Sequence, residues 1–303
     1  MNKYLIFRTD RIGDFLLSMI LIKSIKRNDK NSYVIIISSE KNYDYIKSFN
    51  LIDEVIMLKK GYINRVKLIY KLSKHKFNFS IIHDGKKRSK FINFFLKKNN
   101  TLKVNNDDIK NSHFIKLKKI IDSMNFKFNL KDLDILTNRS FSNEKIDKTK
   151  YIILHYDEKW SNKTYISKYI DIEPSKEQLL RFINNIRHKC NDQIVITTGL
   201  ITPEILKNTI SEINDQNVKL IEGLNFKELE KIVSHSKLLI SCHGAISHVA
   251  SAYNIRQIDI IDINSKEPYS NWTDHFRNYS SIYRENFSNL SSKILNNDYF
   301  SQI

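Results

Sequence analysis

Short apolar runs alternate with longer segments along this chain, and polar residues separate the two. A short run rich in Ile, Leu and Val predicts a strand buried in a parallel sheet, whereas apolar residues at helical spacing predict a helix. In the first half this pattern predicts strands at residues 4–7, 34–37, 55–58 and 79–82, and helices at residues 15–25, 43–49 and 63–73. Alternation at this spacing is typical of parallel βαβ units.

The same alternation resumes after a stretch, residues 99–150, in which the periodicity weakens. It predicts strands at residues 151–154, 193–198, 219–221, 237–240 and 258–261, and helices at residues 175–188, from 203, 226–235 and from 246. We place the linker at residues 140–150 and expect the tail from Tyr283 to fold back as helices. The predicted fold is α/β, with two Rossmann-like doubly wound domains, residues 1–145 and 146–303, and a cleft between them.

The composition is that of a folded protein with a strong positive charge. The 303 residues are 41% hydrophobic, which is enough apolar material for a sizeable core, and the net charge is +17. This charge favours an acidic partner: nucleic acid, an anionic membrane surface or a phosphorylated substrate. We interpret the basic residues as spread along the chain, in a sequence that is rich in lysine, asparagine and isoleucine throughout. The charge is therefore weaker evidence for an acidic partner.

Cysteine content and hydropathy indicate where the protein works. Cys190 and Cys242 are too few for a disulfide framework, and no metal-binding spacing occurs, so we expect no metal and a reducing compartment. Charged residues interrupt the first apolar segment too early for a signal peptide. No apolar run reaches the roughly 18 to 20 residues that span a bilayer. We therefore expect a cytoplasmic protein, soluble or peripheral on the inner face of the cytoplasmic membrane.

Residues 240–252 have the sequence of a strand end, a tight loop and a helix. The small residues Gly244 and Ala245 would let an anion approach the unpaired N–H groups of the first helical turn, and His243 and His248 offer side-chain donors. This arrangement predicts a phosphate or diphosphate pocket at the carboxyl end of a strand. An ordinary strand-to-helix turn with structural histidines explains the same residues.

The loop after the first strand, residues 8–14, lies where ligands bind in α/β proteins. Gly13 gives the backbone freedom, and Asp14 opens the following helix. A carboxylate at this place is a candidate general base toward an acceptor hydroxyl. An acidic residue in the first turn also stabilises the helix dipole, and from the local sequence alone we favour that simpler role.

Two further positions carry candidate donor-binding chemistry. Lys159 is a candidate for neutralising a diphosphate, and Trp160 for anchoring the loop or stacking on a ring, although a solvated charged loop with a packed tryptophan explains both. Glu204 follows a predicted strand and is a candidate for binding ribose hydroxyls or, equally, an ordinary first-turn residue.

Charge clusters elsewhere give weaker signals. Lys86, Lys87 and Arg88 follow the fourth strand and would hold a polyanionic acceptor, but a solvated charge run is the safer interpretation. The acidic pairs at residues 107–108 and 157–158 are not a catalytic dyad, since adjacent residues do not face each other on a helix. No Walker loop, GxGxxG, zinc spacing or GxSxG elbow occurs.

Taken together, these segments resemble glycosyltransferase family 9, the heptosyltransferases of lipopolysaccharide core assembly. Residues 8–14 resemble the family's opening segment, which ends in Gly-Asp, and the residues around Lys159 resemble its Lys-(Arg/His)-Trp loop. Residues 224–252 resemble its C-terminal signature, in which a helix and a strand lead to D-[ST]-G-x-x-H-x-x-A-A. The resemblance covers residues 1–97 and 151–262, and three weak motifs in the right order make it fairly specific.

The resemblance implies a GT-B fold and an inverting, metal-independent sugar transfer without a cofactor. The donor nucleotide-sugar, which we expect to be an ADP-sugar, would bind the C-terminal domain and the acceptor the N-terminal domain. Asp14 would be the catalytic base. The residues that would bind the donor are Lys159, Glu204, Leu224, His243, Gly244, Ala245 and His248. Those that would bind the acceptor are Arg11, Lys86, Lys87 and Arg88.

The sequence also departs from the family pattern. With the signature aligned on His248, the family's Asp falls at His243, its Ser or Thr at Gly244 and its Gly at Ala245. An ionisable ring thus replaces an acidic residue near the donor, so either His243 contacts phosphate directly or the donor sugar differs from heptose. We therefore predict a nucleotide-sugar glycosyltransferase and keep heptose as one candidate sugar.

The implied partners are a nucleotide-sugar, a phosphorylated or lipid-linked glycan of the lipopolysaccharide kind, and an anionic membrane surface, with no nucleic acid. Two alternatives remain open. The charge of +17 and the 11% of aromatic residues would suit a nucleic-acid-binding protein, although no binding motif occurs. A GT-B relative that hydrolyses or epimerises a nucleotide-sugar would keep the donor site without using Asp14 as the base.

Overall fold

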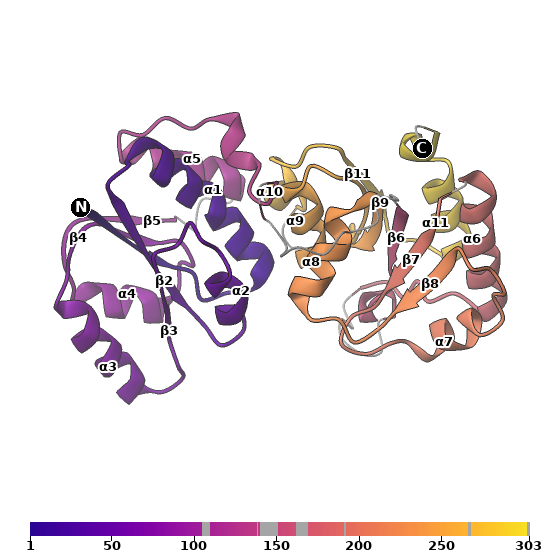
Figure 1. The fold of residues 1–303 in the computed structure, drawn as a ribbon, viewed down its shortest axis with the longest axis horizontal. Helices are drawn as coiled ribbons and strands as arrows, with labels where there is room; N and C mark the ends of the chain where they lie inside the picture. The colour runs from indigo at the N-terminus through magenta and orange to yellow at the C-terminus, as the bar shows by residue number, and fades with distance from the viewer. Residues whose placement is uncertain are drawn as a thin grey trace. The chain divides into compact units, whose positions relative to one another are not determined.

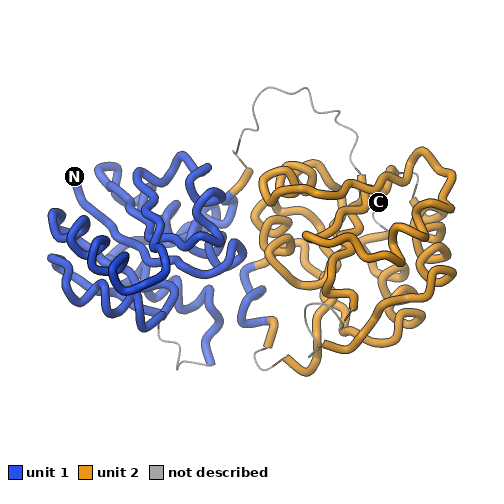
Figure 2. The backbone as a smooth tube through the Cα atoms, turned by 90° about the horizontal axis from the view of Figure 1, so that it is seen from below, with its two compact units in different colours: residues 1–135, 270–275 blue, residues 136–269, 276–303 orange. Residues whose placement is uncertain are grey.

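The computed structural model describes residues 1–104, 110–137, 139, 151–161, 169–190, 192–265 and 268–301, except the side chain of Ser301. The chain divides into two compact units, each with its own sheet and core (Figure 2). Unit 1 comprises residues 1–135 and 270–275, and unit 2 comprises residues 136–269 and 276–303. The predicted linker at 140–150 and the predicted boundary after residue 145 lie outside the described residues.

Unit 1 contains a parallel sheet in the order β3-β2-β1-β4-β5. Its strands are β1 (Asn2–Phe7), β2 (Ser32–Ser38), β3 (Glu54–Met57), β4 (Lys76–Ile82) and β5 (Lys97–Lys103). Its helices are α1 (Ile12–Asn28), α2 (Tyr43–Lys47), α3 (Tyr62–Ser73), α4 (Lys87–Phe94), α5 (His113–Ser123), the 3₁₀ helix η1 (Leu130–Leu133) and α10 (Ser270–Thr273) (Figure 1).

Both faces of the central strands of the first sheet are buried. On β1, Leu5 and Phe7 pack in one cluster with Leu68 and Leu72 of α3, while the alternate residue Ile6 is equally buried on the opposite face. This double burial explains why the strands are continuous apolar runs rather than alternating ones.

Unit 2 contains a second parallel sheet in the order β11-β10-β9-β6-β7-β8. Its strands are β6 (Tyr151–His155), β7 (Ile194–Thr197), β8 (Val218–Ile221), β9 (Ser236–Cys242), β10 (Arg256–Ile261) and β11 (Tyr279–Tyr283). Its helices are η2 (Glu158–Trp160), α6 (Lys176–Lys189), α7 (Glu204–Ile210), α8 (Phe226–Ser234), α9 (Ala245–Ala252), α11 (Phe287–Leu295) and α12 (Asp298–Ser301). This strand order is the one typical of dinucleotide-binding folds.

The α/β doubly wound class is confirmed, and the predicted strands and helices occur within a few residues of their expected ends. The pattern missed β5, an edge strand of mostly exposed lysine and asparagine residues that, among the described strands, pairs only with β4. It also missed α4, α5 and β11. A further element that it missed is α10, whose Trp272 packs against His113 with ring centroids 3.6 Å apart. This contact places residues 270–275 in unit 1, whereas the sequence had assigned them to the second domain.

Candidate functional site

In unit 2 the strand order reverses between β6 and β9, and the loops that carry Lys159 and Gly244 leave the carboxyl ends of these two strands. Since β6 and β9 pair in register, His155 beside Ser241, the two loops emerge side by side. Open parallel sheets bind their ligands at such a reversal of strand order.

The Lys159 ammonium lies against the backbone that begins α9. A Cβ built on Gly244 would stand only 2.5 Å from Nζ of Lys159, so a side chain at residue 244 would take the place of the ammonium. The next amides, of Ala245 and Ile246, have no acceptor within the helix and carry the positive end of its dipole. A cation and a helix N-terminus at one point form a site for a phosphate or diphosphate.

Lys159 is held in this position by Asp157. Its Nζ donates to Oδ2 of Asp157 at 2.8 Å, and its backbone N–H donates to Oδ1 at 3.1 Å. Burial would raise the pKa of Asp157, but the Lys159 ammonium and His155 hold it well below its usual range. Burial would likewise lower the pKa of Lys159, but Asp157 outweighs it and raises that pKa. The site therefore presents a fixed ammonium rather than a mobile surface lysine.

The loop that carries Lys159 is anchored in the core. Trp160 stacks on Tyr156 with ring centroids 4.7 Å apart, and its Nε1 donates to the carbonyl of His155 at 3.1 Å. Arg284, directly after β11, donates to the carbonyl oxygens of Lys159 and Ile170, both at 2.7 Å. Trp160 thus anchors the loop, as one of its two predicted roles required. The sequence pattern did not single out Arg284. Its position as a charged residue at the end of a strand was the available signal.

His243 contacts a buried carboxylate. Its Nδ1 lies 2.5 Å from Oδ2 of Asp259. The Asp259 side chain has no exposed surface, and it also accepts from Ser247 at Oδ1 (2.8 Å) and from Tyr279 at Oδ2 (3.2 Å). Nδ1 is therefore committed to Asp259, and only Nε2 of His243 can face a ligand. The sequence pattern did not single out Asp259, although a carboxylate between Ile258 and Ile260 in an apolar strand was an available signal.

The remaining predicted donor residues lie on separate elements. His248 is buried on α9, with its ring centroid 5.7 Å from that of His243 and 5.1 Å from that of Phe276. Glu204 is the exposed first residue of α7, and Leu224 is half-buried in the loop before α8. In the described residues, neither Glu204 nor Leu224 forms a hydrogen bond or an ion pair with Lys159.

Cys242 ends β9 beside this site but is not a nucleophile. Burial raises the pKa of its thiol to about 12, although the nearby Arg284 acts in the opposite direction. NH1 of Arg284 lies 3.3 Å from the sulfur. At neutral pH the thiol therefore stays protonated.

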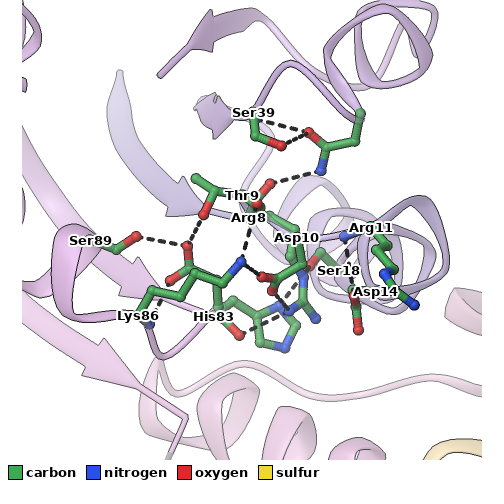
Figure 3. Close-up of polar contacts among 12 residues, drawn as sticks. Arg8, Thr9, Asp10, Arg11, Asp14, Ser18, Ser39, His83, Lys86 and Ser89 are labelled. Carbon is green, nitrogen blue, oxygen red and sulfur yellow. Dashed lines mark hydrogen bonds and ion pairs between the residues drawn. The ribbon is translucent and has the colours of Figure 1, made fainter. Parts of the chain in front are cut away.

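In unit 1 the strand order reverses between β1 and β4, and the loops after these strands form a polar network (Figure 3). Oγ1 of Thr9 donates to Oδ2 of Asp84 at 2.6 Å, which ties the two loops together. Arg88 donates to the Thr9 carbonyl at 3.0 Å, and Lys86 forms an ion pair with Asp10. Two of the predicted acceptor ligands, Lys86 and Arg88, thus shape the first loop, and Lys87 is exposed on α4.

Asp14 occupies the first turn of α1 at this network (Figure 3). Its Oδ2 accepts from the backbone N–H of Arg11 at 3.2 Å, whereas Oδ1 has no hydrogen-bond partner in the described part of the chain. Asp14 is half-buried and the Arg11 side chain is exposed. This carboxylate both caps the helix and keeps one oxygen available as a proton acceptor.

His83 is a component that sequence analysis missed. Nε of Arg8 donates to Oγ of Ser18 at 2.8 Å, so the hydroxyl hydrogen of Ser18 is free to point to Nδ1 of His83 at 2.7 Å. Burial, reinforced by the charge of Arg8, holds the pKa of His83 well below its usual range. The imidazole is therefore neutral at neutral pH.

No protein-family model matches the chain, and no curated protein matches its sequence. Its structure is similar to Escherichia coli heptosyltransferase WaaC with ADP (TM-score 0.70, 11% identity, 96% of this chain and 98% of that one). It is also similar to E. coli ADP-heptose lps heptosyltransferase II (0.67, 12%, 100% and 99%) and to the UDP-GlcNAc 2-epimerase from Methanocaldococcus jannaschii (0.51, 13%, 99% and 94%). The fold is that of the heptosyltransferases.

The heptosyltransferase fold confirms the GT-B architecture that the sequence resemblance implied. Within the described part of this fold, no group of three His, Cys, Asp or Glu side chains is arranged to hold a metal ion. No helix in the same residues combines the length and the apolar character needed to cross a bilayer.

Proposed function

We propose that the protein is an inverting, metal-independent glycosyltransferase that moves a sugar from a nucleoside diphosphate onto a glycan. The observation that carries this proposal is the Lys159 ammonium at the N-terminus of α9, separated from it only by Gly244. Positive charge fixed in this way stabilises a diphosphate most when the glycosidic bond breaks and the diphosphate gains charge.

The donor in this proposal is an ADP-sugar. One heptosyltransferase of the same fold, E. coli WaaC, is known both with ADP and with ADP-2-deoxy-2-fluoro heptose. Lys159, Ala245 and Nε2 of His243 would bind the diphosphate, and His248 would support His243. Glu204 and Leu224 would bind the ribose and the base. Heptose is one candidate sugar.

The acceptor in this proposal is a phosphorylated or lipid-linked glycan at the inner face of the cytoplasmic membrane. Oδ1 of Asp14 would take the proton of the acceptor hydroxyl while its oxygen attacks the anomeric carbon and the nucleoside diphosphate leaves. Arg11 and Lys87 are exposed beside this loop and would bind the acceptor anion, while Lys86 and Arg88 hold the loop in shape.

Thermal-shift measurements with ADP, UDP, GDP and CMP test the donor site first, because a ligand that binds the folded state raises the melting temperature. We expect one nucleoside diphosphate to stabilise the protein and Lys159→Ala to abolish the shift. Lys176→Ala, which removes a half-buried lysine that forms an ion pair with Glu212 in the same unit, is the matched control. No shift with any nucleotide, together with salt-dependent RNA or DNA binding, would instead support the nucleic-acid alternative.

Asp14→Asn then tests the reaction. This variant should keep the nucleotide-induced shift and lose sugar transfer by at least about 100-fold, since a positioned base contributes typically that much. If Asp14→Asn still turns over the donor, the transfer proposal fails and a hydrolase or epimerase replaces it.

A further inference from the structure

Helix α3 has apolar residues on two sides. Leu68 and Leu72 are buried against the sheet, as expected for a surface helix. Tyr62, Ile63 and Tyr70, which share the outward side, are 67%, 70% and 69% exposed. An amphipathic helix normally presents polar residues on its outward side, so this apolar stripe needs a second partner.

Helix α4 continues the stripe. Phe94 is 78% exposed and Phe95, directly after the helix, is 50% exposed. Phe91 joins the two helices, because its ring centroid lies 6.3 Å from that of Tyr62 and 5.2 Å from that of Phe95. Figure 1 shows α3 and α4 as neighbours, and we name the surface formed by these residues the α3–α4 surface. Its members are Tyr62, Ile63, Tyr70, Phe91, Phe94 and Phe95.

The segment that carries this surface holds most of the protein's net charge. Residues 59–103 contain 14 Lys and Arg and a single acidic residue, Asp84, so they carry +13 of the total of +17. This corrects the interpretation that the basic residues are spread along the chain. Around the surface, Lys67 and Lys90 are exposed, and Nζ of Lys74 lies 5.0 Å from the Tyr70 ring centroid.

We propose that the α3–α4 surface binds an anionic lipid bilayer. Aromatic and aliphatic side chains would enter the interfacial region while the surrounding lysines meet anionic headgroups, the combination by which interfacial helices bind membranes. A second copy of the chain does not fit, because two segments of +13 would repel each other. This surface does not include Lys159 or Asp14, so the proposal does not depend on the proposed sugar transfer.

Co-sedimentation with vesicles tests the proposal in the full-length protein. We expect binding to phosphatidylcholine vesicles that contain phosphatidylglycerol and no binding to phosphatidylcholine alone. Replacing Ile63 and Phe94 by Ser should weaken binding on the order of tenfold, since each substitution removes an inserted apolar side chain. Leu130→Ser is the matched control, because Leu130 is an apolar residue of unit 1 that is 71% exposed but lies on η1.

The basic residues are tested separately with Lys67→Glu and Lys90→Glu, with Lys127→Glu as the control lysine of the same unit. The first pair should abolish binding to the anionic vesicles, and the control should not. Equal binding by the wild type and the Ile63/Phe94 variant would overturn the proposal, as would the absence of binding to anionic vesicles. Preferential binding of RNA over vesicles would overturn it in favour of a nucleic acid as the occupant.

Discussion

Lys159 and Gly244 occupy adjoining space: a methyl group on residue 244 would stand 2.5 Å from the Lys159 ammonium nitrogen. Lys159 follows β6 and Gly244 follows β9, so the two meet only because these strands pair at the centre of the second sheet. The absence of a side chain at residue 244 is what lets a cation reach the first turn of α9.

Gly244→Ala should therefore weaken donor binding with little effect on folding. The backbone there is extended (φ −177°), which suits alanine, and the atom in the way is the far end of a flexible side chain. Displacing the ammonium removes a charge-assisted contact, so we expect about tenfold weaker nucleotide binding. Calorimetric titration measures the affinity, and the melting temperature without nucleotide is the control. Wild-type affinity in Gly244→Ala would mean that Lys159 does not contact the ligand.

Asp157→Asn should make unit 2 less stable at neutral pH and less sensitive to acid. Because the folded pKa of Asp157 is depressed, its ionised form contributes stability above the unfolded value of about 4, and this contribution is lost as the pH falls through the folded value. Removing one partner of a buried ion pair costs about 3 kcal/mol at pH 7.

Fluorine NMR of fluorotryptophan-labelled protein measures this effect in unit 2 alone. The chain has two tryptophans, Trp160 in unit 2 and Trp272 in unit 1, so each unit has its own signal during urea unfolding. The difference between wild type and Asp157→Asn should narrow as the pH falls. A difference that is constant with pH would contradict the assignment.

His83 should make unit 1 less stable in mild acid. The pKa of His83 in the folded state lies below the unfolded value of about 6.5. In mild acid, His83 therefore binds a proton in the unfolded chain but not in the folded chain. Stability is then fully present above about pH 7 and falls below it by at most ~1.4 kcal/mol per pH unit. His83→Gln should flatten this dependence in the Trp272 signal and leave that of Trp160 unchanged. An unchanged slope in the variant would show that another group titrates.

His243 and Asp259 should be energetically coupled. His243→Asp, which restores the acidic residue of the family signature, would place two carboxylates where a 2.5 Å hydrogen bond now lies. We expect it to cost about 3 kcal/mol of stability in unit 2, since it takes the His243 contact away from a buried carboxylate and places a second carboxylate beside it. Adding Asp259→Asn should restore at least about 1 kcal/mol in a double-mutant cycle. Strictly additive effects would show that the two positions do not interact.

The heptosyltransferase-like fold was largely readable from the sequence because most of its strands are buried on both faces. Short apolar runs such as residues 34–37 are typical of strands in the interior of a parallel sheet. The helical segments between these runs favour βαβ connections between neighbouring parallel strands. Where burial was weak, as in β5, the pattern failed, because an exposed edge strand is stabilised by pairing with β4 and not by its own side chains.

The sequence by itself also identified the loops that carry the candidate site residues, since Asp14, Lys159 and His243 each follow an apolar strand. Only the tertiary structure decided what these residues contact. Asp157 holds Lys159, Asp259 holds His243, and two residues of the basic run after β4 bind the loop before Asp14. Most of these partners lie on strands and loops that are far apart in the chain. They meet because of the strand order and register of each sheet, which local hydrophobic periodicity does not encode. Asp157 is close to Lys159 in sequence, but it belongs to an acidic pair that no motif distinguishes.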